Sequence, residues 1–136
     1  MWPIRSSTGW LGLSVALVAM ALAAAGGAAW MSKQQTARIA RTISGGNPDQ
    51  APELIRRYGC GGCHTIPGIP GADGQVGPPL SDLIHRVYIG GVAINSPDRL
   101  AQWIVSPQQF SPHSAMPATG ISAAEARDVA AYLYSQ

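Results

Sequence analysis

The feature that most constrains this chain is the run Cys60-Gly61-Gly62-Cys63-His64. Two cysteines three residues apart, followed directly by a histidine, have the spacing through which a haem is attached covalently. On a helical turn, positions i, i+3 and i+4 share one face, so both thiols and the imidazole point the same way. We expect the thiols to bond the two vinyl groups of a porphyrin and His64 to be an axial iron ligand. The intervening glycines should leave room for the macrocycle.

Two other uses of a Cys-x-x-Cys pair compete with this interpretation. A zinc site needs further ligands, and outside the motif the chain offers only His85 and His113. A thioredoxin-like dithiol belongs to an alternating strand and helix pattern, which this glycine- and proline-rich chain lacks. The remaining sequence supplies the other parts that a haem requires, so we favour the haem.

The N-terminal segment is the second constraint. Residues 6–32 contain no charged side chain, and Trp10 and Trp30 lie twenty positions apart. On a helix that separation is about 30 Å, the hydrocarbon thickness of a bilayer, with a tryptophan at each interface. The sequence predicts that residues 1–31 are an uncleaved signal-anchor spanning a membrane once. The alternative is a cleaved signal peptide with Arg5 as its charged region and cleavage in the alanine-rich end.

The rest of the chain divides into a connector and a domain. The polar connector at residues 32–46 is either a flexible chain or a helical extension through Ile39 and Ile43. The small residues at 19–29 either indicate packing against other membrane subunits or reflect an alanine-rich composition. The domain at residues 47–136 is small for a stable core, and a buried haem would supply much of its apolar interior.

Three helices are expected in this domain, which makes its fold class all-α. The first begins near Asn47 or Pro52 and runs into the cysteine motif. The second begins at Asn95-Ser96-Pro97, with a capping residue followed by proline, and ends before Pro107. The third begins at Ser122, with Glu125 completing a capping box. The glycine- and proline-rich stretch between the first two helices should form a loop wrapped over the haem.

Met116 is the candidate for the sixth iron ligand. It is the one methionine after Cys63, and it precedes a proline in the loop between the second and third helices. A thioether is a soft ligand that raises the reduction potential and fills the coordination site, which suits electron transfer. His113 and His85 are the rivals, and either would give bis-histidine ligation at a lower potential.

These residues together resemble the class I c-type cytochromes over residues 47–136. Gly77-Pro78-Pro79-Leu80 is similar to a family segment in which the proline carbonyl accepts the free imidazole N–H of the ligand histidine. The resemblance implies that role for Pro78, and packing on the methionine side of the haem for Trp103. It also implies that Tyr132 packs on the first helix of the domain. The expected cofactor is one covalently attached haem c, bound by Cys60, Cys63, His64, Pro78, Trp103 and Met116, with His64 and Met116 as the iron ligands.

A narrower resemblance involves the segment from Asn95 to Pro117. It is similar to the cytochrome c domain fused to subunit II of caa3-type oxidases; the shared residues are Asn95, Pro97, Leu100, Trp103, Ile104, Pro107, Pro112, Met116 and Pro117. This chain lacks the copper-binding cupredoxin domain of that subunit, and it has no spare cysteines to build one. The resemblance therefore implies an independent, membrane-tethered relative.

The charge of the domain limits its partners. Residues 47–136 contain seven acidic residues, five arginines and no lysine, a net charge of −2. No basic patch with interleaved aromatic residues indicates nucleic-acid binding, and no small-molecule substrate is expected. Docking is instead expected through an apolar rim formed by Ile66, Ile69 and Val76.

The resemblance implies an electron carrier, not an enzyme. We expect a membrane-anchored monohaem cytochrome c that carries single electrons from a quinol-oxidising complex to a terminal oxidase. A tightly bound electron-entry subunit of a larger membrane oxidoreductase is the alternative. A haem gas sensor or peroxidase would need an open iron site, against which Met116 argues. The resemblance to c-type cytochromes implies that the haem domain lies on the periplasmic side of the cytoplasmic membrane. The positive charges of Lys33, Arg38 and Arg41 after the span would instead favour the cytoplasmic side.

Overall fold

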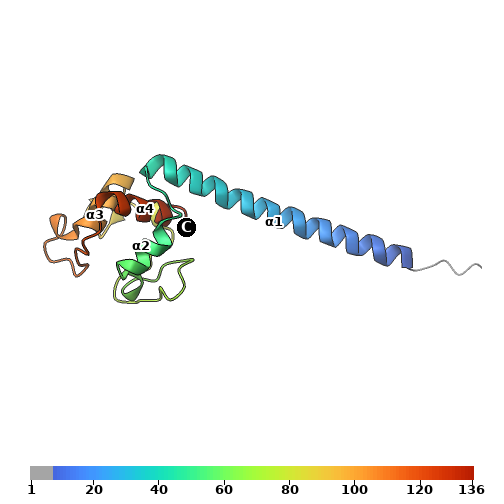
Figure 1. Cartoon of the computed structure of the whole chain (residues 1–136), viewed down its shortest axis with the longest axis horizontal. Coiled ribbons are helices and arrows are strands. Elements are labelled where there is room, and N and C mark those ends of the chain that lie inside the picture. Colours follow the sequence, from blue (N-terminus) through green and yellow to red (C-terminus); the bar gives the residue numbers. More distant parts are fainter. Residues whose placement is uncertain (1–7) are drawn as a thin grey trace, which may run out of the picture. The chain divides into compact units, whose positions relative to one another are not determined.

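The computed structural model describes residues 8–136 (Figure 1). Arg5, and the side chain of Trp10, lie outside the part that is described. The chain divides into two compact units, which meet between Gln35 and Thr36. The elements in order are α1 (Thr8–Ser44), α2 (Ala51–Arg57), a 3₁₀ turn (Cys60–Gly62), a second 3₁₀ turn (Leu83–His85), β1 (Tyr88–Ile89), β2 (Ala93–Ile94), α3 (Pro97–Val105), a third 3₁₀ turn (Pro107–Gln109) and α4 (Ala123–Tyr134).

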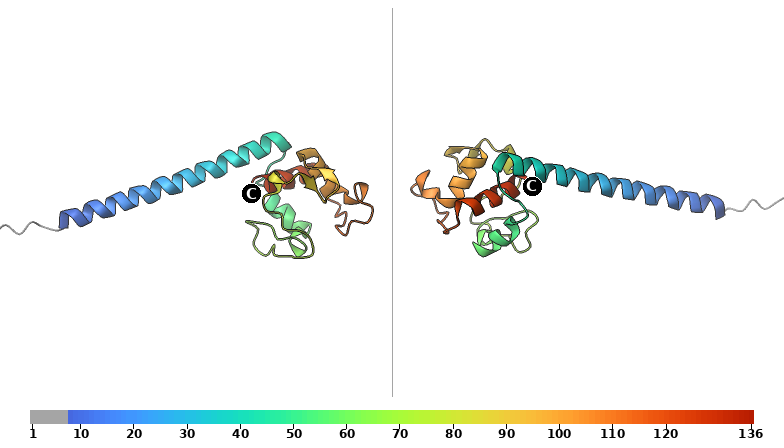
Figure 2. Two further views of the ribbon diagram at one scale, coloured as in Figure 1. Left: turned by 180° about the vertical axis from the view of Figure 1, so that it is seen from behind. Right: turned by 45° about the horizontal axis from the view of Figure 1, so that its top comes forward.

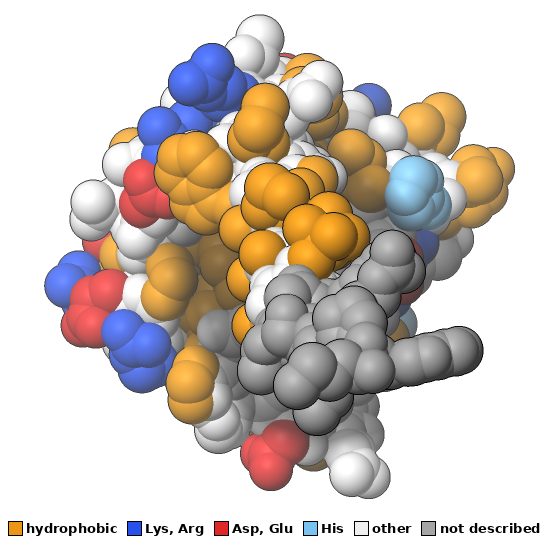
Figure 3. Space-filling model, turned by 90° about the vertical axis from the view of Figure 1, so that its right-hand side faces the viewer, with side chains coloured by type: hydrophobic (Ala, Val, Ile, Leu, Met, Phe, Trp, Pro, Cys, Tyr) orange, Lys and Arg blue, Asp and Glu red, His pale blue; other side chains and the backbone are white. Residues whose placement is uncertain are grey.

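Helix α1 has the length and composition of a membrane-spanning helix. Among the described residues it is the one helix that qualifies, over Gly12–Ser44 with a mean hydropathy of 1.9. A signal sequence near an N-terminus has the same properties. Its 37 residues correspond to about 55 Å, more than a bilayer core requires. Figure 3 shows hydrophobic side chains gathered near the centre of this view.

The connector, which the sequence left open, is helical as far as Ser44. Its last residues belong to the second compact unit, where Ala40 and Ser44 are buried. Arg41 forms an ion pair with Asp49 just beyond the helix end. Gly46 then lies directly against the backbone of Arg127, where a Cβ atom would be 2.1 Å from the carbonyl oxygen. The end of α1 is therefore fixed to the domain by packing, by charge and by a contact that only glycine permits.

The three expected helices are present: α2 begins at Ala51 without a side-chain cap, and α3 and α4 begin at the expected caps. Ser96 accepts a 3.3 Å hydrogen bond from the Arg99 backbone N–H at the start of α3. Ser122 and Glu125 form a reciprocal capping box at the start of α4. Helix α4 packs against both α2 and α3 (Figure 1) and contributes buried side chains to one core; these are Ala126, Val129, Ala130, Ala131, Leu133 and Tyr134.

A small antiparallel hairpin, which the sequence did not predict, lies between the glycine- and proline-rich loop and α3. Tyr88 pairs with Ile94, and Ile89 pairs with Ala93. Gly90 and Gly91 make the turn with positive φ angles of 55° and 73°, a conformation that glycine adopts without strain. Two residues per strand are too few to produce an alternating pattern, so no strand could be predicted here from the sequence.

The predicted docking rim is wrong for two of its three residues, which are buried in the loop that follows α2. Ile66 and Ile69 are 3% and 6% exposed and belong to the core, so they cannot line an exposed rim. The chain turns back on itself between them, because Ile66 N–H donates to the Ala72 carbonyl at 3.0 Å. Val76 alone of the three is exposed, at 81%. Figure 2 shows this loop leaving α2 and returning toward it.

Candidate haem site

The cysteine motif begins one residue after the turn that ends α2. Gly59 has a φ of 70°, and the 3₁₀ turn at Cys60–Gly62 follows directly. The Cys60 carbonyl accepts the backbone N–H groups of Cys63 at 3.2 Å and of His64 at 3.0 Å. Both thiols are half-buried and form no disulfide. One tight turn therefore carries the two cysteines and the histidine, as the spacing predicts.

One glycine of the motif, Gly61, has a packing role within the protein, whereas the Cβ position of Gly62 faces open space. A Cβ atom at Gly61 would lie 2.8 Å from the Cβ of Ala72, so Gly61 allows the returning loop to contact the turn. Gly74 approaches the backbone of Gly62 in the same way, with its own N–H donating to the Gly61 carbonyl at 3.1 Å. The absence of side chains at 61 and 74 is thus explained by backbone contact within the protein. The sequence argument, which assigned the motif glycines to the macrocycle, did not foresee this.

The two competing interpretations of the cysteines find no support in the structure. Burial raises the pKa of the Cys60 thiol, whereas a redox dithiol needs a thiol whose pKa is lowered. Within residues 8–136, no three His, Cys, Asp or Glu side chains are grouped as a metal site of protein ligands alone would require.

His64 is held by the segment Gly77–Leu80. Its Nδ1 lies 2.8 Å from the Pro78 carbonyl oxygen, where it donates a hydrogen bond. Gly77 lies directly against the ring, because a Cβ atom there would be 2.3 Å from Cε1. This hydrogen bond fixes the tautomer and leaves the Nε2 lone pair free to bind a metal.

Met116 is positioned through its backbone. The Gln108 side-chain amide donates to the Met116 carbonyl at 2.7 Å and to the Ser114 carbonyl at 3.4 Å. The Met116 N–H donates to the Ser114 hydroxyl at 3.3 Å. Met116 is half-buried, whereas the rival ligand His113 is exposed. The sequence contained no signal for Gln108, because a glutamine eight residues before a methionine has no characteristic pattern.

Trp103 packs where the hairpin and α3 meet. A Cβ atom at Gly90 would lie 2.4 Å from the Trp103 ring, so the hairpin turn rests on the indole. The Phe110 ring lies 6.0 Å from it, centroid to centroid, in a tilted arrangement. Phe110 is an aromatic contact that the sequence analysis missed. The other expected aromatic residue, Tyr132, packs against the core that includes Ile55 of α2, and its hydroxyl donates to the Pro67 carbonyl at 2.7 Å, in the loop after the motif.

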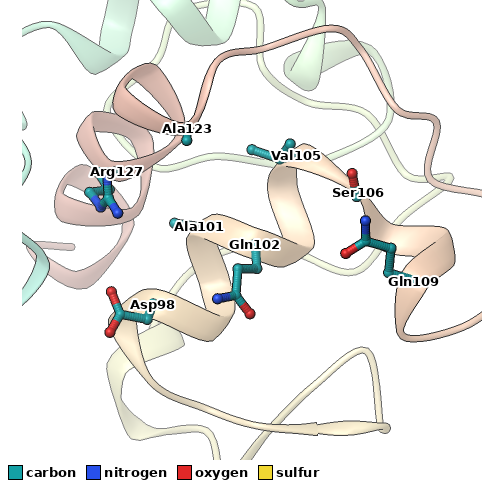
Figure 4. Close-up of a pocket in the computed structure, with 8 residues that line it drawn as sticks. All are labelled: Asp98, Ala101, Gln102, Val105, Ser106, Gln109, Ala123 and Arg127. Atoms are coloured by element: carbon teal, nitrogen blue, oxygen red, sulfur yellow. The ribbon is translucent and has the colours of Figure 1, made fainter.

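A separate pocket of about 170 Å³ lies between α3 and α4. Figure 4 shows Asp98 and Arg127 at one end of it and Ser106 with Gln109 at the other. None of the six residues predicted to bind the cofactor lines this pocket, so it does not belong to the candidate site.

The comparison with protein families decides the identity of the domain. A family model described as cytochrome c matches residues 49–136, well over half of the chain. The chain belongs to the cytochrome c family. No curated protein and no solved structure gives a significant match. As a cytochrome c, the domain holds covalently attached haem c and acts as an electron carrier.

The residues of this cytochrome c fit the haem. Two unpaired thiols share one turn with a histidine whose Nδ1 is already engaged, and a half-buried thioether is held on a separate loop. A haem supplies a one-electron iron couple to such a site. Cys60 and Cys63 would hold it covalently, Pro78 orients the His64 ring, and Gln108 holds the backbone of Met116. These residues would in this way supply attachment and orientation to the haem, which is what an electron carrier requires of its protein.

Proposed function

We propose that this protein is a membrane-anchored cytochrome c with one haem, in which His64 and Met116 are the axial ligands. The observation that carries the proposal is the 2.8 Å contact between His64 Nδ1 and the Pro78 carbonyl. It holds the ring as a ligand histidine is held, with one nitrogen donating and the other free. A single Cys-x-x-Cys-His motif, with no cysteine elsewhere, supports one haem per chain. Met116 completes the iron coordination, so the site suits electron transfer and not gas sensing or peroxidase chemistry.

Near-infrared and visible spectroscopy test this ligand pair. The oxidised wild-type protein should show the sulfur-to-iron charge-transfer band, and Met116→Ala should abolish the band, lower the reduction potential and let the reduced protein bind carbon monoxide. His113→Ala is the matched control, because it removes an exposed side chain on the same loop. A wild-type spectrum without the band, combined with bis-histidine features that change in His113→Ala, would exclude Met116.

Helix α1 is proposed as the anchor, with the haem domain on the periplasmic side of the cytoplasmic membrane. Its apolar length supports a single span. The charge count after the span opposes this side, although one of its three cations, Arg41, is paired with Asp49. Cysteine-accessibility labelling at Ser7→Cys and Ser135→Cys in intact cells would distinguish the two topologies. Labelling of position 135 alone by a membrane-impermeant reagent is expected.

The proposed partners are a quinol-oxidising complex as donor and a terminal oxidase as acceptor. The likeness to the cytochrome domain of caa3-type oxidase subunit II supports the oxidase as acceptor. Purification in mild detergent, followed by identification of the co-purifying subunits, tests this assignment.

Removal of residues 1–35 should slow reduction of the oxidase far more than a change from low to physiological salt, because an anchor raises the effective concentration of partners in the same membrane.

A permanent subunit role is the second candidate. It is favoured by the surface of α1, where no side chain and no other segment of residues 8–136 lies within 4 Å of a Cβ position at Gly26 or Gly27. Small residues on a membrane helix allow another helix to approach closely. Gly26→Leu together with Gly27→Leu should release a permanently bound cytochrome from its complex, while leaving a mobile carrier unaffected.

A further inference from the structure

We infer that Asn95 and Tyr134 are positioning residues for the axial histidine, to which they are linked through Arg86 and the Pro78-Pro79 segment. This inference rests on the proposed ligand role of His64. The Pro78 carbonyl holds the His64 ring, so whatever holds that carbonyl also sets the ligand. The structure provides a chain of hydrogen bonds that ends at this segment and begins on the C-terminal helix.

The Pro78-Pro79 segment has few hydrogen bonds with which to fix itself. Proline has no backbone N–H, so these two residues offer carbonyls alone. The Pro78 carbonyl accepts from His64, and the Pro79 carbonyl accepts from the Arg86 guanidinium. On either side, Gly77 N–H donates to the Cys63 carbonyl at 2.7 Å and Leu80 N–H donates to the Thr65 carbonyl at 2.9 Å. The Arg86 side chain therefore makes the contact that holds the segment from the side away from the cysteine motif.

Arg86 also fixes the following turn to the same segment. The same Nη2 atom donates to the Ser81 carbonyl at 3.0 Å, so one guanidinium nitrogen joins two carbonyls two residues apart. A guanidinium forms such contacts in a rigid, planar geometry, which a lysine ammonium cannot reproduce. The position of the Pro79 carbonyl thus depends on where the backbone of Arg86 lies.

Asn95 determines that backbone position. Its side-chain amide donates to the Leu83 carbonyl at 2.7 Å and to the Arg86 carbonyl at 2.9 Å. Its backbone N–H donates to the Val87 carbonyl at 2.9 Å. Both donors of the amide group are used, and all three acceptors belong to one turn. Asn95 consequently joins this turn to the start of α3.

Tyr134 connects the turn to α4. Its hydroxyl donates to the Asn95 side-chain oxygen at 2.6 Å, and its side chain is buried in the core. This hydrogen bond orients the Asn95 amide so that the nitrogen faces the two carbonyls. The hydrogen bonds therefore run from Tyr134 to Asn95, from Asn95 to the Arg86 carbonyl, and from the Arg86 guanidinium to the segment that holds His64.

The test compares Asn95→Leu, Tyr134→Phe and Tyr132→Phe in the full-length haem protein. Asn95→Leu removes both donors with little change of shape or charge, and Tyr134→Phe removes the hydroxyl alone. Tyr132→Phe is the matched control, since Tyr132 lies two residues earlier on α4 and donates to Pro67, outside this chain of hydrogen bonds. The readouts are solvent exchange of the His64 Nδ1 proton, measured by NMR in the reduced state, and the reduction potential.

We expect roughly tenfold faster exchange of the ring proton in Asn95→Leu and a smaller increase in Tyr134→Phe. The potential should rise in both, because a weaker bond to Pro78 makes the imidazole a poorer donor to oxidised iron. Tyr132→Phe should lower the unfolding temperature without changing either readout. If all three variants changed stability alone, the inference would be overturned. Failure of the ligand assignment would look different, because the wild-type His64 ring would then lack the large shifts caused by haem.

Discussion

The Tyr58 hydroxyl donates a 3.0 Å hydrogen bond to the Glu125 carboxylate, which joins the end of α2 to the first turn of α4. The same carboxylate accepts from the Ser122 hydroxyl at 2.7 Å and from the Ser122 N–H at 3.0 Å. Arg57 lies 3.5 Å from its other oxygen. A single side chain therefore caps one helix and fastens it to the helix that leads into the cysteine motif.

This arrangement predicts an acid-sensitive contribution to stability. The hydrogen bonds from Ser122, and then that from Tyr58, lower the pKa of Glu125. A carboxyl group with a lowered pKa stabilises the fold above its ordinary pKa of about 4.3, and that stabilisation is lost as the pH falls through the lowered value. Glu125→Gln should be less stable than wild type at pH 7, with the difference shrinking at pH 3 in urea unfolding. Glu53→Gln, which removes an exposed ion pair with Arg56, should have little effect at either pH.

We expect Tyr134 to make a contribution to stability that is lost at high pH, whereas that of Glu125 is lost at low pH. Burial raises its pKa to about 12, above the ordinary value of 10. The unfolded chain therefore releases this proton at a lower pH than the folded protein does. The contribution of the Tyr134 hydroxyl to the free energy of unfolding is complete below pH 10 and is lost as the pH rises toward 12. Tyr134→Phe should flatten this part of the stability profile, measured by urea unfolding between pH 9 and 12. Some decline should persist, because burial also raises the pKa of Tyr132. An unchanged profile would contradict the expected role of Tyr134.

Gly77→Ala should disturb the ligand histidine directly. The added methyl group would lie 2.3 Å from Cε1 and 2.6 Å from Nδ1 of His64, so either the ring or the loop must move. Overpacking of this kind costs about 1–3 kcal/mol. Gly12→Ala, on α1, is the control, because no side chain and no other segment of the described residues lies within 4 Å of its Cβ position. Urea unfolding and the His64 ring resonances should both change in Gly77→Ala, and equal behaviour of the two variants would refute the proposed contact.

Replacement of Cys60 and Cys63 tests both the covalent attachment of the haem and the dependence of folding on it. Cys60→Ala or Cys63→Ala leaves one thioether at most, so haem staining after denaturing electrophoresis should weaken, and the double variant should retain none. The double variant should also lose helix content and become sensitive to protease, because a domain of this size depends on the cofactor for part of its core. His85→Ala, at an exposed position, should leave both properties unchanged. Normal folding of the double variant without haem would show that the protein core is sufficient.

The parts of the fold that the sequence predicted are those determined by neighbouring residues. Ser96 with Pro97, and Ser122 with Glu125, begin helices through contacts within one turn, and the structure has both caps as expected. The burial of Ile66 was not predictable, because it depends on a turn closed by Ala72 and on a core built from distant segments.

The candidate site divides in the same way. The spacing of Cys60, Cys63 and His64 is local, and the resemblance supplied Pro78 as the partner of the histidine. The support behind these residues comes from long-range contacts without a sequence pattern, such as that of Gln108 with Met116. The hairpin could not be predicted, because strands of two residues are too short to show an alternation of apolar and polar side chains.

Pro78, whose carbonyl holds His64, is followed by a second proline, and this pair also bears on the speed of electron exchange. A proline ring confines φ of its own residue to about −65°, and a following proline confines ψ of the residue before it to extended values, so the Pro78 carbonyl has little freedom to rotate. If the iron gained or lost one electron, a mobile carbonyl would reorient, and that reorientation would add to the barrier of each electron transfer. Here the acceptor of the histidine proton is covalently stiff, so the imidazole can keep one position in both oxidation states. We therefore expect the backbone itself, through two proline rings that do not touch the iron, to keep the reorganisation energy low.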